Sequence, residues 1–190
     1  MAWWIKARRA HDVLLTGLVV SLLLALAIGG QEVALPSLVA GTHQTVLTMF
    51  VPIPLVAALA VSLGSRLPGI ESSGVRRIGL WDAGLVAAVL AAWLAAGALT
   101  GSGVLLVSGR NAAFLVALML LARPLAAEAA VMVPVAWTML VVAFNRRPPP
   151  DPEPWTILPE PGSAPHAALA TAVLLTAGLV SLQFTHRDSS

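Results

Sequence analysis

The stretch VLLTGLVVSLLLALAIG, residues 13–29, contains no ionisable side chain. A bilayer core about 30 Å thick needs roughly 20 apolar residues of helix to cross it, with a lower limit near 17. Backbone amides and carbonyls inside lipid must hydrogen-bond within their own segment, so a run of this kind forms a helix. The stretch therefore predicts a membrane-spanning helix.

Further apolar runs of similar length repeat this pattern along the chain. They cover residues 45–63, 83–99, 104–122, 125–144 and 167–184. The chain is 58% hydrophobic and 11% charged, which is far from the composition of a soluble domain. We expect an all-α, polytopic transmembrane bundle of about six spans, located as a multi-pass protein in a bacterial plasma membrane with the lipid bilayer around it.

Segments of different composition flank these runs. Residues 1–12 carry two Trp and three basic side chains, which predicts an interfacial segment before the first span. The first five spans form the bundle over residues 13–144. Residues 145–165 hold eight prolines, a composition that predicts an extended Pro-rich loop before the last span at 167–184.

Two spans contain residues that predict how they pack. Pro52 and Pro54 lie inside the second span, where each proline removes a backbone donor and is expected to kink the helix. The third span is rich in small residues, with Ala87, Ala91 and Ala95 at four-residue spacing. Small residues let helices approach closely in lipid, so this span is expected to pack inside the bundle. Residues 30–44 contain no Lys or Arg, as an outside loop should.

The distribution of basic residues leaves two topologies open. Six full spans put both termini inside, with eight of the eleven basic residues on the cytoplasmic side. If residues 104–123 instead dip into the membrane and return, Arg146 and Arg147 move inside while Arg123 and Arg187 move outside, and the count is the same. We favour six spans because residues 104–122 are long enough to cross. Five spans plus a re-entrant segment is the alternative.

Arg110, Asn111 and Glu128 are candidates for polar groups that act inside the membrane. A charge at that depth is costly unless it is paired or hydrated, so it is a functional hypothesis by default. Glu128 could pair with Arg123 across a proline, or it could neutralise Arg110 on the adjacent helix. Alternatively, Arg123 and Glu128 mark the interface, where long side chains reach water. For Arg110 with Asn111, a structural role and a role in a transport path both stay open.

The sequence contains no recognisable catalytic, cofactor-binding or metal-binding motif. It has no Cys, and His43, His166 and His186 each lack a second ligand at helical spacing. The nucleophile-elbow, zinc-protease, P-loop and dinucleotide patterns do not occur. We therefore expect a protein that is not an enzyme and has no cofactor. A net charge of only +2, scattered between apolar runs, also argues against nucleic acid as a partner.

The loop between the second and third spans is the best candidate for a surface that contacts a partner. Glu71, Arg76 and Arg77 are interleaved there with apolar residues, a pattern that favours a short amphipathic helix at the membrane surface. Such a helix could dock on a cytosolic subunit. The alternative is a solvated basic loop that only anchors the topology.

An interfacial N-terminal helix, a first helical hairpin, a charged loop after the second span and about six spans resemble the membrane subunit of an ABC-2-type exporter. The resemblance implies that Trp3–Arg9 forms the connecting helix and that Glu71, Arg76 and Arg77 dock on a nucleotide-binding ATPase. It implies a non-catalytic subunit of a multicomponent transporter, in a homo- or hetero-oligomer. The stretch WTILPEP, Trp155–Pro161, has no counterpart in that family and looks like a signature of a small bacterial membrane family. A second hypothesis is a structural or scaffolding membrane protein without a transport path.

Overall fold

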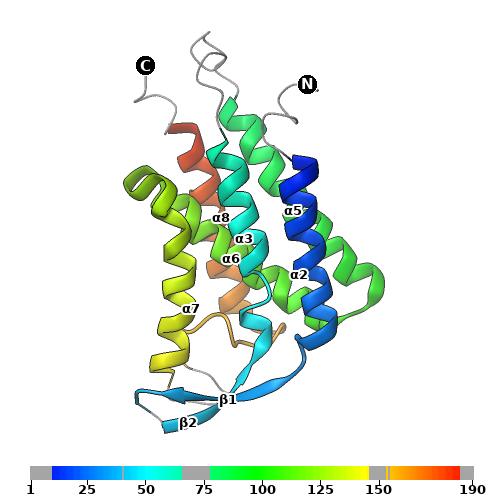
Figure 1. The fold of residues 1–190 in the computed structure, drawn as a ribbon, viewed down its shortest axis with the longest axis vertical. Helices are drawn as coiled ribbons and strands as arrows, with labels where there is room; N and C mark the ends of the chain where they lie inside the picture. Colours follow the sequence, from blue (N-terminus) through cyan, green and yellow to red (C-terminus); the bar gives the residue numbers. More distant parts are fainter. Residues whose placement is uncertain (1–9, 40, 66–77, 146–152, 154, 185–190) are drawn as a thin grey trace.

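The computed structural model describes residues 10–39, 41–65, 78–145, 153 and 155–184. These residues are mostly helical and include one two-stranded sheet. The helices run up and down along the long axis of the molecule (Figure 1). The α-helices are α2 (Leu15–Ile28), α3 (Ile53–Gly64), α5 (Ile78–Thr100), α6 (Gly103–Ala126), α7 (Met132–Phe144) and α8 (Pro165–Phe184). Shorter helical turns are η1 (Ala10–Leu14), η2 (Leu47–Met49) and η3 (Ala127–Val131).

Four helical segments are long and apolar enough to cross a membrane. They are Leu47–Gly64, Gly79–Thr100, Gly103–Phe144 and Pro165–Gln183, and a further apolar helix, Asp12–Ile28, is shorter. The expected number of about six spans is therefore not confirmed by this count. The fourth and fifth expected spans form one helical stretch of 42 residues. Within it the chain turns back at η3, where Ala127 has a φ of 46°, and α7 packs alongside α6 (Figure 1).

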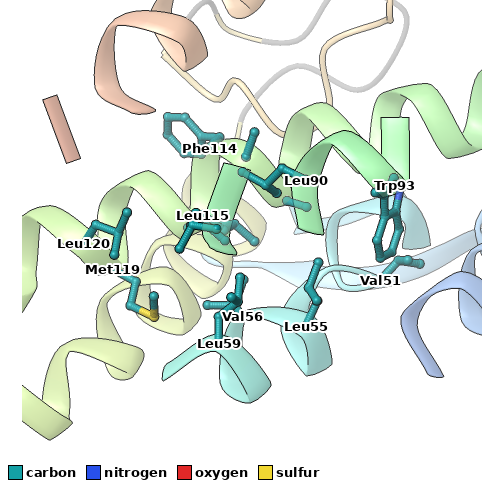
Figure 2. Close-up of a cluster of buried hydrophobic side chains, with 14 of the residues drawn as sticks. Val51, Leu55, Val56, Leu59, Leu90, Trp93, Phe114, Leu115, Met119 and Leu120 are labelled. Atoms are coloured by element: carbon teal, nitrogen blue, oxygen red, sulfur yellow. The ribbon is translucent and has the colours of Figure 1, made fainter. Parts of the chain in front are cut away.

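Helix α6 is the central helix of the bundle. It packs against α2, α3, α5, α7 and α8, and twelve of its 24 residues are buried. Figure 2 shows Leu115 and Met119 of α6 above Val56 and Leu59 of α3 in this core. The helix that carries Arg110 is thus enclosed by protein, an environment in which polar side chains can find partners within the chain.

The second expected span begins differently from the prediction. Residues expected to form a loop pair as an antiparallel hairpin of β1 (Glu32–Ser37) and β2 (Gly41–Val46). Helix α3 starts only at Ile53, with Pro52 as its N-cap residue and Pro54 in its first turn. The first amides of a helix have no partner within the helix, so proline is favourable there. The two prolines therefore start α3 and do not kink it.

The third expected span packs through its large residues. Val86, Leu90 and Trp93 of α5 are buried, whereas Ala87, Ala91 and Ala95 are exposed. The prediction that this alanine row packs inside the bundle is therefore wrong.

The close approach of α5 to α6 depends on a glycine of α6. A Cβ atom on Gly109 would lie 2.7 Å from Cδ1 of Trp93, so only glycine leaves room for the indole ring. The same indole donates a 3.0 Å hydrogen bond from Nε1 to the carbonyl oxygen of Leu105. The large indole thus both packs closely against α6 and forms a hydrogen bond with its backbone.

The two ends of the bundle differ in structure. One end, here called the hairpin end, carries β1 and β2 and residues 155–164 (Figure 1). The hairpin is attached there to α7, because the amide of Leu38 and the hydroxyl of Ser37 both donate to the carbonyl oxygen of Ala143, at 2.9 and 2.8 Å. At the opposite end, Nη2 of Arg123 donates to the carbonyl oxygen of Leu63 in the last turn of α3.

Candidate functional site

The start of α6 fixes the position of Arg110. The hydroxyl oxygen of Ser102 accepts a 3.3 Å hydrogen bond from the amide of Leu105, which caps the helix. Arg110 lies seven residues after the first helical residue, Gly103, or roughly 10 Å along the axis at 1.5 Å per residue. Its side chain therefore belongs to the half of the bundle nearest the hairpin end.

The guanidinium of Arg110 binds the backbone of residues 155–164, which we call the strap. Its Nη1 donates to the carbonyl oxygen of Pro161 at 2.8 Å. Its Nη2 donates to the carbonyl oxygens of Glu160 at 2.7 Å and Ile157 at 3.1 Å, with that of Leu158 at 3.5 Å. One side chain thus bridges carbonyls spread over five consecutive residues.

Asn111 completes this arrangement. Its Nδ2 donates to the carbonyl oxygen of Leu158 at 2.9 Å, and its Oδ1 accepts from Nε and Nη2 of Arg110 at 3.3 and 3.0 Å. Asn111 is fully buried. It therefore both orients the guanidinium and binds the strap directly.

The strap needs such donors because its backbone is irregular and partly buried. Thr156, Ile157, Leu158 and Glu160 are all buried, although they belong to no helix or strand. Buried carbonyls outside secondary structure must find donors elsewhere, most of all at the depth of a membrane. The planar fork of an arginine can serve several carbonyls at once, which the point charge of a lysine cannot. Arg110 and Asn111 thus have a clear structural role.

The strap is also attached to α8. Oε1 of Glu160 lies 3.2 Å from Nε2 of His166, which is in the first turn of that helix. The Glu160 side chain is 7% exposed and the His166 side chain 49% exposed. The pair therefore joins a buried carboxylate of the strap to a histidine at the surface.

Three aromatic rings attach the start of the strap to α6 and α7. The ring centroids of Phe114 and Trp137 are 5.8 Å apart, and those of Trp137 and Trp155 are 6.4 Å apart with nearly perpendicular planes. These separations and tilts are favourable for aromatic pairs. The strap therefore contacts α6, α7 and α8.

Glu128 lies far from this site. It is an exposed residue of η3, after the end of α6, and the helix between Arg110 and Ala126 is roughly 24 Å long. Glu128 therefore does not neutralise Arg110 in this structure. Arg123, the other partner considered for Glu128, reaches the end of α3.

The remaining predicted site residues cannot be placed. Glu71, Arg76 and Arg77 lie outside the described residues, as does Trp3–Arg9. In the part of the chain that the structure describes, no group of three His, Cys, Asp or Glu side chains is arranged to hold a metal ion.

Sequence reasoning missed the strap as a partner of Arg110. Each side of this contact carried a signal in the sequence. One was the polar pair Arg110 and Asn111 in an apolar run, and the other was the unusual stretch Trp155–Pro161. Nothing local connects them, because 47 to 51 residues separate the bonded atoms along the chain.

These features define a helical bundle with helices that could cross a membrane and with a strap bound in one end of it. Comparisons with known protein families, with curated proteins and with solved structures found no match.

Proposed function

We propose that this chain is an integral membrane protein that crosses the plasma membrane six times with both termini in the cytoplasm. The alternating direction of α2, α3, α5, α6, α7 and α8 supports this topology (Figure 1). The first half of α6 is bonded to the strap, and its last turn is bonded to the last turn of α3. Helix α6 therefore runs the full length of the bundle, which favours a full crossing over a re-entrant segment.

The basic residues support the same orientation. By position along the chain, the proposed topology assigns eight of the eleven basic residues to the cytoplasmic side. Basic residues accumulate on the cytoplasmic side of membrane proteins, so the hairpin and the strap would face outside. The eight are Lys6, Arg8, Arg9, Arg66, Arg76, Arg77, Arg123 and Arg187, and the three not assigned to the cytoplasm are Arg110, Arg146 and Arg147.

Cysteine labelling tests this topology cleanly because the native chain has no Cys. In intact cells, a membrane-impermeant maleimide should label Pro150→Cys and leave Ser73→Cys unlabelled until the cells are opened. Equal labelling of both positions, or the reverse pattern, would refute the six-crossing proposal.

Within this topology the protein would act as a non-catalytic membrane subunit of a multicomponent transporter. The observation that carries this proposal is that α3 ends and α5 begins at the same end of the bundle, opposite the hairpin (Figure 1). The proposed topology puts this end in the cytoplasm, so residues 66–77, which join the two helices in the sequence, would be available to a cytosolic ATPase. Glu71, Arg76 and Arg77 are its docking candidates. Hydrolysis of nucleotide would take place in the ATPase.

A matched pair of charge reversals tests the docking proposal. An ATPase should copurify with the native chain in mild detergent and be lost with Arg76→Glu/Arg77→Glu. The control, Arg146→Glu/Arg147→Glu, reverses a similar pair that the proposed topology puts on the outer side, and it should keep the partner. Absence of any ATPase from the native preparation would count against this function.

One observation favours a second function, a scaffolding membrane protein without a transport path. The bonds of Arg110 go to the backbone of its own chain and to Asn111, a structural use of this charge. In that case Arg110→Leu should loosen the strap yet leave copurifying partners in place. A transport subunit that uses Arg110 should keep its partners but lose transport.

A further inference from the structure

The hydrogen bonds of Arg110 leave one of its donors unused. A guanidinium carries five N–H groups, two of them on Nη1. Nε and Nη2 together face four carbonyl-type oxygens, whereas Nη1 has a single acceptor, the carbonyl oxygen of Pro161. One Nη1 hydrogen therefore has no partner among the residues that the structure describes.

The charge of Arg110 also lacks a contacting anion. Each of its acceptors is a neutral oxygen, from the backbone or from Asn111. Across the described ranges no carboxylate oxygen lies within 4.0 Å of the guanidinium; the carboxylate of Glu160 attracts it from a greater distance and pairs with His166. A guanidinium forms stronger hydrogen bonds with a contacting oxyanion than with neutral acceptors, so this contact position favours an oxyanion.

The unused donor lies at an accessible edge. Pro161, which accepts from Nη1, is exposed, and so is the next residue, Gly162. Close to Gly162, a side-chain Cβ would meet only Val107, at 3.2 Å. The hydrogen bond between Nη1 and Pro161 is accordingly at the exposed edge of the strap.

We propose that Arg110 binds a phosphate oxyanion through Nη1 at this edge of the strap, beside Pro161. The phosphate could belong to a phospholipid headgroup or to a free phosphate in solution. The lipid source rests on the proposed crossing of the membrane, whereas the free source does not. Arginine side chains near the membrane surface commonly extend toward the phospholipid headgroups.

The first experiment uses the full chain purified in a maltoside detergent that contains no phosphorus. Inorganic phosphate is titrated against chloride at constant ionic strength while the unfolding temperature is measured. The native chain should show a saturable rise of a few degrees, because a ligand bound only by the folded state stabilises it. The rise should vanish in Arg110→Gln and persist in Arg123→Gln, a matched guanidinium at the opposite end.

The second experiment distinguishes the two sources. Native mass spectrometry of the chain released from phospholipid nanodiscs should show one retained phospholipid if the headgroup is the ligand. That adduct should be lost in Arg110→Gln and kept in Arg123→Gln. A saturable effect of inorganic phosphate without a retained lipid would assign the site to free phosphate.

If Arg110→Gln also loosens the strap, its loss of phosphate binding would have two explanations. Two further measurements separate them. Arg110→Lys keeps the charge without the planar fork and should bind phosphate at least several-fold more weakly. The native titration needs no variant at all. If the native chain neither gains stability from phosphate nor retains a phospholipid, the proposal is refuted, whatever the topology proves to be.

Discussion

Nη1 of Arg110 donates a 2.8 Å hydrogen bond to the carbonyl oxygen of Pro161, 51 residues further along the chain. This bond joins the central helix of the bundle to a loop that precedes its last helix. A charged residue in an apolar run is thus used to hold irregular backbone in a buried position. The arrangement explains why a helix in the core can carry an arginine, and it makes the strap the first place to test.

Arg110→Leu should release the strap. Buried carbonyls would lose their donors, at about 1–3 kcal/mol for each buried group left unsatisfied. Thr156→Cys reports on release of the strap, because residue 156 is fully buried in the docked strap. Its maleimide labelling should be slow in the native background and at least tenfold faster with Arg110→Leu.

Exposed strap residues provide the control for that labelling. Ser163→Cys lies at the surface and should react quickly in both backgrounds. If Cys at position 156 reacts as quickly as at position 163 in the native background, the strap is not docked as described here.

A disulfide should form between the strap and α6 in Val107→Cys/Gly162→Cys. A Cβ on Gly162 would lie 3.2 Å from Cγ2 of Val107, a separation that suits a bridge, and the backbone there has no positive φ. The chain has no native Cys to compete. Mild oxidation should produce a mobility shift on a non-reducing gel that dithiothreitol reverses.

Gly17→Ala should destabilise the contact between α2 and α3. The added Cβ would lie 2.3 Å from Cβ of Ala58, so the two helices would have to move apart. Overpacking of this kind costs about 1–3 kcal/mol. The matched control is Gly84→Ala on α5, where nothing lies within 4 Å and the change should be neutral or stabilising by up to about 1 kcal/mol. Equal unfolding temperatures for the two variants would contradict the α2–α3 packing.

Ser21→Ala should weaken the start of α3. The hydroxyl oxygen of Ser21 on α2 accepts a 3.1 Å hydrogen bond from the amide of Leu55, in the first turn of α3. The pair is buried, so water cannot replace the lost acceptor, and a cost of about 1–2 kcal/mol is expected. Thr176→Ala removes an exposed hydroxyl that bonds only within α8 and should change the free energy of unfolding by less than about 0.5 kcal/mol. Chemical unfolding in detergent measures both.

Substitutions on the two faces of α5 should differ sharply. Leu90→Ala removes a buried side chain and should cost about 2–4 kcal/mol, whereas Ala91→Leu enlarges an exposed one and should cost little. Unfolding in detergent measures the stability of each variant. A large loss with Ala91→Leu and none with Leu90→Ala would restore the alanine row as the packing face.

The sequence predicted the helical segments well because the signal for them is local. A run such as residues 13–29 has no ionisable side chain, and its backbone hydrogen bonds close within the run itself. The helices of the structure accordingly fall on the expected apolar runs, and the basic residues between the runs supplied the proposed orientation. For α3 the sequence predicted the apolar run but not the residue at which the helix begins, since Pro52 and Pro54 can either kink a helix or begin one.

The tertiary structure alone decided which faces meet and what the polar residues contact. The alanine row of α5 and its large residues are both apolar, and only the space that Gly109 leaves for Trp93 shows which face packs inward. Likewise, the sequence could mark Arg110 as unusual, but its partner is set by how α7 and α8 bring the strap back to α6. Helix formation depends on neighbours along the chain, whereas these contacts depend on residues about fifty positions apart, which no local pattern encodes.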